Sequence, residues 1–245
     1  MRLNKLLNKL YIILLFILIL NNKTYASSII ISSASDALFK SMNGPLTSNI
    51  KKEEVKSEDE FLKLVNYSHP IELDYVPPLT DITGGQKMHT KVAPIVERLL
   101  VDSKADKISL YVVSGYRSSD RQGYLFNKKL QNNLSKGKKE MVAFMDSIKI
   151  NPLPGTSEHQ TGLCMDIVDM SYKNLDEKQE KTDGYKWMLK HCADYGFILR
   201  YPKDKTNITG IIYEPWHFRY VGVDAAKHIM QNNLTLEEYI LGKIN

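Results

Sequence analysis

The sequence has few cysteines and no apolar run long enough to cross a membrane. Its 245 residues include only two cysteines, Cys164 and Cys192. A framework of several disulfides is therefore excluded, and we favour two buried free thiols over a single bridge. A membrane-spanning helix needs roughly 20 apolar residues, whereas the longest apolar run, Leu10–Leu20, has 11. The chain also has no internal repeat, which excludes a repeat architecture.

The sequence also lacks a strong excess of one charge sign outside its first residues. The formal net charge is +5, but residues 1–26 contain four Lys or Arg and no Asp or Glu. The rest of the chain has 29 basic and 28 acidic residues, a net charge of about +1. Such a balance gives little support to nucleic-acid binding, and we expect no nucleic-acid partner.

The first 26 residues are typical of a secretory signal peptide. Three basic residues precede the Leu10–Leu20 run, and the segment 24–26 ends in the small residue that a signal peptidase needs. We therefore expect cleavage after Ala26 and a secreted or extracytoplasmic protein at the cell envelope. Retention of residues 1–26 as an N-terminal anchor is the alternative, and only then would the protein be attached to the membrane.

Composition divides the remaining chain into two parts. Residues 27–60 are rich in Ser, Lys, Glu and Asn and have few large apolar side chains. This composition predicts a tether of low order, because it cannot bury much surface. Residues 61–245 are expected to form a single domain, and we expect the protein to be a monomer.

Apolar spacing in residues 61–245 predicts both helices and strands. Because the two types do not alternate regularly, we expect an α+β fold with a small central antiparallel sheet and flanking helices. Strands are predicted at residues 108–113, 163–168, 197–201 and 218–221. Helices are predicted at residues 86–103, 118–133, 183–195, 223–232 and 235–241.

The imidazole of His159 and the carboxylate of Asp166, near one predicted strand, are candidate metal ligands. A catalytic zinc takes three protein ligands from His, Asp, Glu or Cys and leaves one position for water. His159 and Asp166 are seven residues apart, which on a helix would separate them by about 10 Å along the axis. They could share one ion only if the chain turns back between them, and Thr161-Gly162 is suited to such a turn.

The segment Glu214-Pro215-Trp216-His217 is a second candidate. Proline at the second position is typical of a tight turn, which holds the first and fourth residues within about 7 Å. His217 is therefore a possible third ligand, and Glu214 would lie beside the metal as a general base. Each residue alone has an ordinary structural interpretation, such as an exposed histidine or a surface turn. Their joint presence, each at a strand boundary, favours a catalytic site.

Seven blocks of residues in order resemble the VanY-type D-alanyl-D-alanine carboxypeptidases. The wider group includes VanX-like dipeptidases, L,D-carboxypeptidases and the hedgehog signalling domain. The resemblance covers about residues 62 to 240. The blocks are Leu64–Asn66, Asp74–Pro77, Ser114–Ser118, Ser157–Gly162, Asp166–Ile167, Tyr195–Pro202 and Tyr213–Gly222.

The resemblance implies a zinc site and a catalytic base. Zinc would be the cofactor, in a cleft carried by the sheet, with His159, Asp166 and His217 as its ligands. Glu214 would be the base. The expected partners are peptidoglycan stem peptides, from which the enzyme would remove the terminal D-residue.

The resemblance also implies a substrate pocket. Arg117 would bind the substrate or stabilise the charged intermediate, and its planar fork can hold a carboxylate with two hydrogen bonds. Gln122 and Ser157 match positions that the family uses in its pocket. Cys164 departs from the family, whose members usually have a small alanine there.

Three other functions stay open at this point. A phage-like endopeptidase is the least favoured of them, since no separate wall-binding module is visible in the sequence. An L,D-carboxypeptidase acting on the tetrapeptide stem would use the same site with a different pocket shape. A non-catalytic, zinc-stabilised domain that binds the cell wall would need no base. The presence of Glu214 together with all three ligands favours the enzyme.

Overall fold

The computed structural model describes residues 60–244, which all lie within one compact unit. The predicted signal peptide, and the predicted tether apart from Glu60, lie outside the described residues. Within residues 60–244, no helix has both the length and the apolar character needed to span a bilayer.

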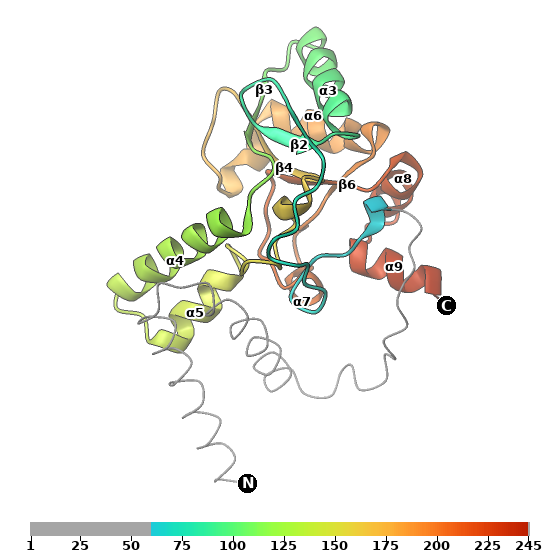
Figure 1. Cartoon of the computed structure of the whole chain (residues 1–245). Coiled ribbons are helices and arrows are strands. Elements are labelled where there is room, and N and C mark those ends of the chain that lie inside the picture. The colour runs from blue at the N-terminus through green and yellow to red at the C-terminus, as the bar shows by residue number, and fades with distance from the viewer. Residues whose placement is uncertain (1–59, 245) are drawn as a thin grey trace. The chain divides into compact units, whose positions relative to one another are not determined.

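A four-stranded antiparallel sheet lies at the centre of the described residues (Figure 1). Its strands follow the order β3-β4-β6-β5, and a separate two-stranded sheet pairs β1 with β2. The predicted α+β class and the antiparallel central sheet are confirmed. The strands are β1 (Leu79–Asp81), β2 (Lys87–His89), β3 (Leu110–Ser114), β4 (Cys164–Asp169), β5 (Phe197–Leu199) and β6 (His217–Tyr220).

Helices surround the sheet. The α-helices are α3 (Ala93–Ala105), α4 (Ser119–Ser135), α5 (Glu140–Ile148), α6 (Asp183–His191), α7 (Thr206–Thr209), α8 (Val223–Gln231) and α9 (Leu236–Ile244). Short 3-10 helices are η1 (Glu60–Leu62), η2 (Glu158–Thr161), η3 (Glu177–Lys181) and η4 (Cys192–Tyr195).

One face of the central sheet is apolar. Met165 and Ile167 of β4 and Phe218 of β6 belong to the main buried core. That core also includes Leu99 of α3 and Met188 of α6, so these two helices cover this face. Since alternate side chains of a strand point to opposite faces, the odd-numbered residues of β4 fix the orientation of the whole strand.

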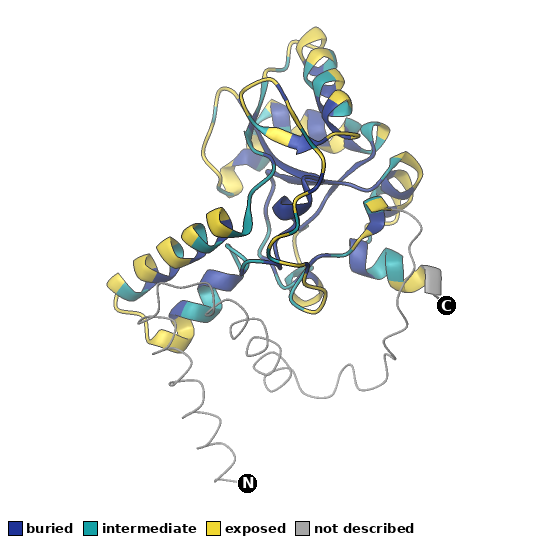
Figure 2. Ribbon diagram, viewed as in Figure 1, coloured by how far each residue is buried: buried dark blue, intermediate teal, exposed yellow. Residues whose placement is uncertain are grey.

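The other face of the same sheet carries buried polar side chains on β4 and β6. Cys164 and Asp166 of β4 point to it, and their register partners on β6 are Arg219 and His217. All residues of β4 and β6 are buried, as the dark blue strands of Figure 2 show. The sheet therefore holds a set of ionisable side chains inside the protein.

The predicted helix at residues 86–103 is wrong at its beginning. Lys87–His89 form β2, and the helix starts only at Ala93 with a proline in its first turn. Pro94 suits that position because the first turn needs no N–H donor there. The N-cap Val92 and the helical residues Val96 and Leu99 are fully buried, so the later part of the predicted helix has the expected buried face.

The pair of helices α4 and α5 extends away from the sheet, side by side (Figure 1). The predicted helix at residues 118–133 corresponds to α4, whose N-cap Ser118 accepts a hydrogen bond from the Arg121 N–H. Helix α5 is absent from the sequence-based expectations. Its packing depends on α4, through Phe126 and Phe144, whose ring centroids are 5.7 Å apart.

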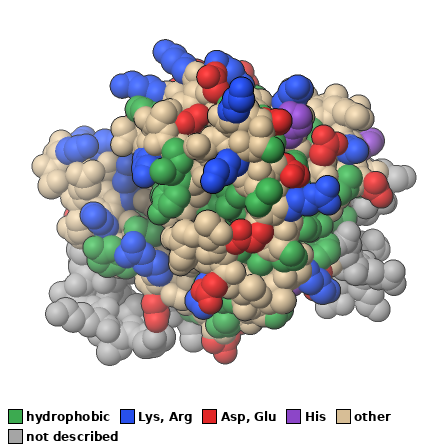
Figure 3. All heavy atoms as spheres, turned by 90° about the horizontal axis from the view of Figure 1, so that it is seen from above, with side chains coloured by type: hydrophobic (Ala, Val, Ile, Leu, Met, Phe, Trp, Pro, Cys, Tyr) green, Lys and Arg blue, Asp and Glu red, His purple; other side chains and the backbone are tan. Residues whose placement is uncertain are grey.

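Both cysteines are free and buried, which confirms the prediction of two free thiols. On the surface seen in Figure 3, Lys and Arg side chains are interspersed with Asp and Glu. That distribution agrees with the nearly balanced charge of residues 27–245.

Candidate metal centre and active site

The chain turns back between His159 and Asp166, as predicted. Helix η2 ends at Thr161, and its C-cap Gly162 has a left-handed φ of +67°. A Cβ at this position would lie 2.9 Å from the His89 backbone nitrogen, so only glycine fits without strain. The turn leads directly into β4 and brings His159 close to Asp166, the third residue of that strand.

A second turn places Glu214 beside His217. The His217 backbone N–H donates to the Glu214 carbonyl oxygen at 3.1 Å, which confirms the predicted tight turn. Glu214 Oε2 lies 3.5 Å from His217 Nδ1. The turn immediately precedes β6, so the pairing of β6 with β4 brings both side chains to Asp166.

Three atoms converge on the polar face of the sheet. Asp166 Oδ1 lies 3.3 Å from His159 Nε2 and 3.2 Å from His217 Nδ1. Two ligand atoms each about 2.0–2.1 Å from one tetrahedral zinc lie about 3.3–3.4 Å apart, so this spacing fits a shared ion. Asp166 Oδ1 and His159 Nε2 are also buried and have no hydrogen-bond partner among the described residues. These unpaired atoms fit metal coordination.

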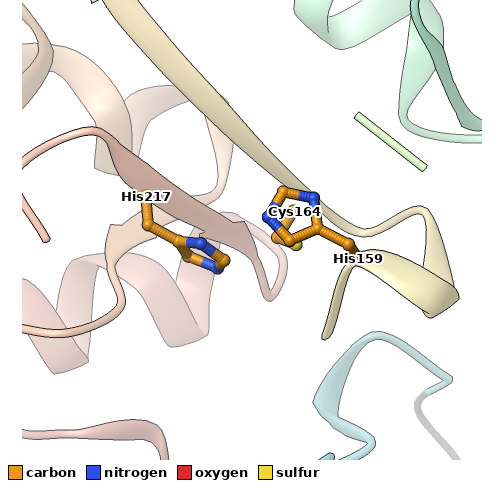
Figure 4. Close-up of side chains that lie close together, drawn as sticks. All are labelled: His159, Cys164 and His217. Atoms are coloured by element: carbon orange, nitrogen blue, oxygen red, sulfur yellow. The ribbon is translucent and has the colours of Figure 1, made fainter. Parts of the chain in front are cut away.

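The Cys164 thiol is a competing ligand. Its sulfur and one ring nitrogen each from His159 and His217 all lie within 4.8 Å of one another, and Figure 4 shows the three side chains together. Asp166 and Cys164 point to the same face of β4. The carboxylate contacts fit zinc more closely, so we favour Asp166 as the third ligand.

The two carboxyl groups of the site have opposite pKa shifts. Burial alone would raise the pKa of Asp166, but His159, His217 and Arg117 lower it well below its ordinary value. Burial raises the pKa of Glu214 to about 8, despite the opposing effect of His217. Asp166 is therefore ionised, as a metal ligand must be, whereas Glu214 readily holds a proton while no metal is bound.

Arg117 borders the same site and is 16% exposed at its side chain. One guanidinium nitrogen donates to Gln122 Oε1 at 3.1 Å, and another lies 3.4 Å from Asp166 Oδ2. Its Nε is buried with no partner among the described residues. Gln122 in turn donates to the Pro152 carbonyl oxygen at 2.7 Å, so its amide fixes the position of Arg117. Ser157 is buried at the N-cap of η2.

Glu158 is a site residue that the sequence-based expectations missed. Its Oε1 accepts hydrogen bonds at 2.8 Å from both Arg200 Nε and Arg219 Nη1. Its Oε2 faces His217 Nε2 at 3.6 Å. Two features of the sequence could have indicated its role. Glu158 directly precedes the candidate ligand His159, and each of the last two family-like blocks contains an arginine.

Two imidazoles and a carboxylate at zinc-ligand spacing, beside a second carboxyl group and a guanidinium, are typical of zinc-dependent hydrolases. The chain belongs more specifically to the VanY family of D-alanyl-D-alanine carboxypeptidases, whose model matches residues 85–223. The expected resemblance is thereby confirmed, and zinc is the cofactor of this family site.

Individual relatives agree with this membership. A D-alanyl-D-alanine carboxypeptidase of Enterococcus faecalis is 36% identical over 190 residues, covering 77% of this chain and 69% of that protein. The structure of a variant of the D,D-pentapeptidase VanY from a VanB-type resistance cassette contains Zn(II). It matches with a TM-score of 0.67 and 36% identity, over 74% of this chain and 98% of the other. The L,D-carboxypeptidase LdcB matches with a TM-score of 0.63 and 37% identity, over 73% and 84%.

Proposed function

We infer that this protein is a zinc-dependent D-alanyl-D-alanine carboxypeptidase that hydrolyses the terminal D-residue of peptidoglycan stem peptides. Family membership supports the substrate class. The single observation that carries the metal chemistry is the convergence of His159, Asp166 and His217 on one buried point at zinc spacing. We assign these three side chains as the zinc ligands.

Zinc, when bound, supplies a Lewis acid that polarises the scissile carbonyl and makes water more acidic. Glu214 then acts as the base. Its carboxylate accepts a proton from the attacking water and returns it to the leaving amine. Burial raises the pKa of Glu214 to about 8 in the metal-free protein, and the positive charge of bound zinc would lower it, so that the carboxylate could accept a proton near neutral pH.

Arg117 is assigned to the negative charge of the substrate. Its partly exposed guanidinium is held by Gln122 on one side and by Asp166 on the other. These contacts engage two of the five N–H groups of the guanidinium, so donors remain for the terminal carboxylate or the oxyanion. Gln122 acts by orienting Arg117, and Ser157 contributes to the pocket next to His159.

The test is hydrolysis of two substrates by the purified protein, with and without a chelator. We expect release of D-alanine from a stem pentapeptide ending in D-Ala-D-Ala, and loss of that activity on zinc removal. The similarity to LdcB supports L,D-carboxypeptidase activity as the second candidate, for which the tetrapeptide stem would be the better substrate. Tight binding of both peptides without any hydrolysis would instead identify a binding domain.

Export is part of the same proposal, since stem peptides of the assembled wall lie outside the cytoplasmic membrane. The basic start and the Leu10–Leu20 run support it. N-terminal sequencing of the exported protein should give Ser27 as its first residue. An intact Met1 in a membrane fraction would identify an anchor instead.

A further inference from the structure

The side chain of Glu158 is completely enclosed and divides its two oxygens between different partners. It is 1% exposed. Oε1 accepts from Arg200 and Arg219 at 2.8 Å each. Oε2 has no hydrogen-bond partner among the described residues and faces His217 Nε2, 3.6 Å away. That nitrogen is likewise buried and unpaired within the described chain.

The charges around Glu158 are balanced by a second carboxylate. Arg200 donates two further hydrogen bonds to Glu237 of α9, at 2.8 and 2.6 Å. Arg219 donates its remaining bonds to backbone carbonyl oxygens of Phe61, Lys63 and Tyr220. Both arginines are fully buried. Two guanidinium groups and two carboxylates thus form a neutral cluster, which can hold an ionised Glu158 inside the protein.

The two nitrogens of His217 have different surroundings. Nδ1 faces Asp166 and Glu214, at 3.2 and 3.5 Å, whereas Nε2 faces Glu158. In a neutral imidazole only one of the two ring nitrogens carries a proton. A nitrogen that binds a metal must be unprotonated, so the proton must lie on the other nitrogen. His159 meets this requirement through a backbone group, because its Nδ1 lies 2.6 Å from the Gly115 carbonyl oxygen.

We propose that Glu158 is a positioning residue for zinc binding, whose carboxylate accepts a hydrogen bond from the Nε2–H of His217, so that the proton stays on Nε2 and Nδ1 is free for the metal. This inference rests on the proposed zinc site. Arg200 and Arg219 hold the carboxylate in place, and its second oxygen fixes the tautomer and the ring orientation of His217. Outer hydrogen bonds of this kind typically change metal affinity about 10- to 100-fold.

The chain provides a matched control. Glu158 and Glu237 are both buried carboxylates that bind Arg200, but only Glu158 faces His217. Glutamine has a single oxygen, so Glu158→Gln cannot serve two arginines and His217 together. Glu237→Gln disturbs the same cluster without touching the imidazole. A purely structural role predicts similar effects of the two variants, and a positioning role does not.

The experiment measures zinc affinity of the full-length metal-free proteins by competition with a chromophoric chelator, after each has been shown to unfold cooperatively. We expect Glu158→Gln to bind zinc about 10- to 100-fold more weakly and Glu237→Gln to match the native protein. Equal affinity in Glu158→Gln and native protein, or equal losses in both variants, would overturn the inference. A native protein that binds no zinc would instead overturn the proposed function.

A second measurement needs no variant and covers the case in which Glu158→Gln fails to fold. Side-chain ¹H–¹⁵N spectra of the zinc-loaded native protein report the tautomer of each histidine. We expect His217 to carry its proton on Nε2. This proton should exchange slowly with solvent, because it is buried and hydrogen-bonded to the Glu158 carboxylate. Coordination of His217 through Nε2, or an Nε2 proton that exchanges as fast as that of an exposed histidine, would contradict the proposal.

Discussion

Asp166 of β4 and His217 of β6 are register partners in the central sheet, and Asp166 Oδ1 lies 3.2 Å from His217 Nδ1. Strand pairing itself therefore places two of the three proposed ligands together. A slip of one residue would turn one of them to the apolar face beneath α3 and α6. The precision of the site rests on the same hydrogen bonds that hold the sheet.

Glu214 and His217 are three residues apart, but substitutions at the two positions should impair the enzyme in different ways. Glu214→Gln removes the proton acceptor while keeping its shape, so we expect a loss in kcat of about 10²–10⁴-fold with zinc retained. His217→Ala removes a ligand, so activity should fall through metal loss and recover in part with excess zinc. Metal analysis and D-alanine release measure both. A zinc-free Glu214→Gln protein, or one with near-native turnover, would contradict the assigned roles.

Arg117→Lys tests recognition of the substrate carboxylate. The variant keeps the positive charge but loses the fork that donates to Gln122 and faces Asp166. We expect much lower activity with zinc retained. Amidation of the substrate's C-terminus should then impair the native enzyme far more than the variant. If amidation impairs both equally, Arg117 acts on the oxyanion or on the structure of the site.

Cys164 and Asp166 provide a test of the ligand set, since both lie on the polar face of β4 near the two histidines. We expect Cys164→Ala to retain zinc and activity, and Asp166→Asn to bind zinc much more weakly. The cobalt-substituted native protein should show no sulfur-to-metal charge-transfer band. A band that disappears in Cys164→Ala would identify the thiol as a ligand.

The raised pKa of Glu214 predicts a pH-dependent stability difference in the metal-free protein. Its ordinary value is 4.5, and burial raises it to about 8. Between these values the folded protein holds a proton that the unfolded chain has released, so the contribution of Glu214 to stability falls as pH rises. Metal-free Glu214→Gln should therefore gain stability relative to metal-free native protein from about pH 5 to 8.

Urea unfolding at several pH values measures this difference. Zinc provides the control, because its positive charge favours the ionised carboxylate and should reduce the pH dependence. Parallel pH profiles of the two metal-free proteins would show that Glu214 does not hold a proton in this range.

Local sequence signals were sufficient for the parts of the site that depend on short turns. The left-handed Gly162 and the turn from Glu214 to His217 are both encoded within a few residues, and both were predicted. The strands that carry the ligands were also found to within a residue or two, because each is a short, buried, apolar-rich segment.

Features that depend on distant partners were missed or misread. Glu158 has its two arginine partners 42 and 61 residues away, and a lone glutamate before a histidine gives no indication of them. Lys87–His89 were predicted as the start of a helix but form β2, because they pair with β1. Helix α5 is formed against α4, so its own sequence carries only part of the signal.

The four-charge cluster of Glu158, Arg200, Arg219 and Glu237 limits how the sequence can change. Loss of one member leaves a partner's charge uncompensated in the interior, at a cost of about 3–5 kcal/mol, whereas a paired replacement by apolar residues can be close to neutral. Arg200 and Glu237 should therefore vary together among functional sequences. Because Glu237 belongs to α9, the last helix within the described residues, we expect a truncation before that helix to inactivate the enzyme through its folding, although no proposed catalytic group is removed.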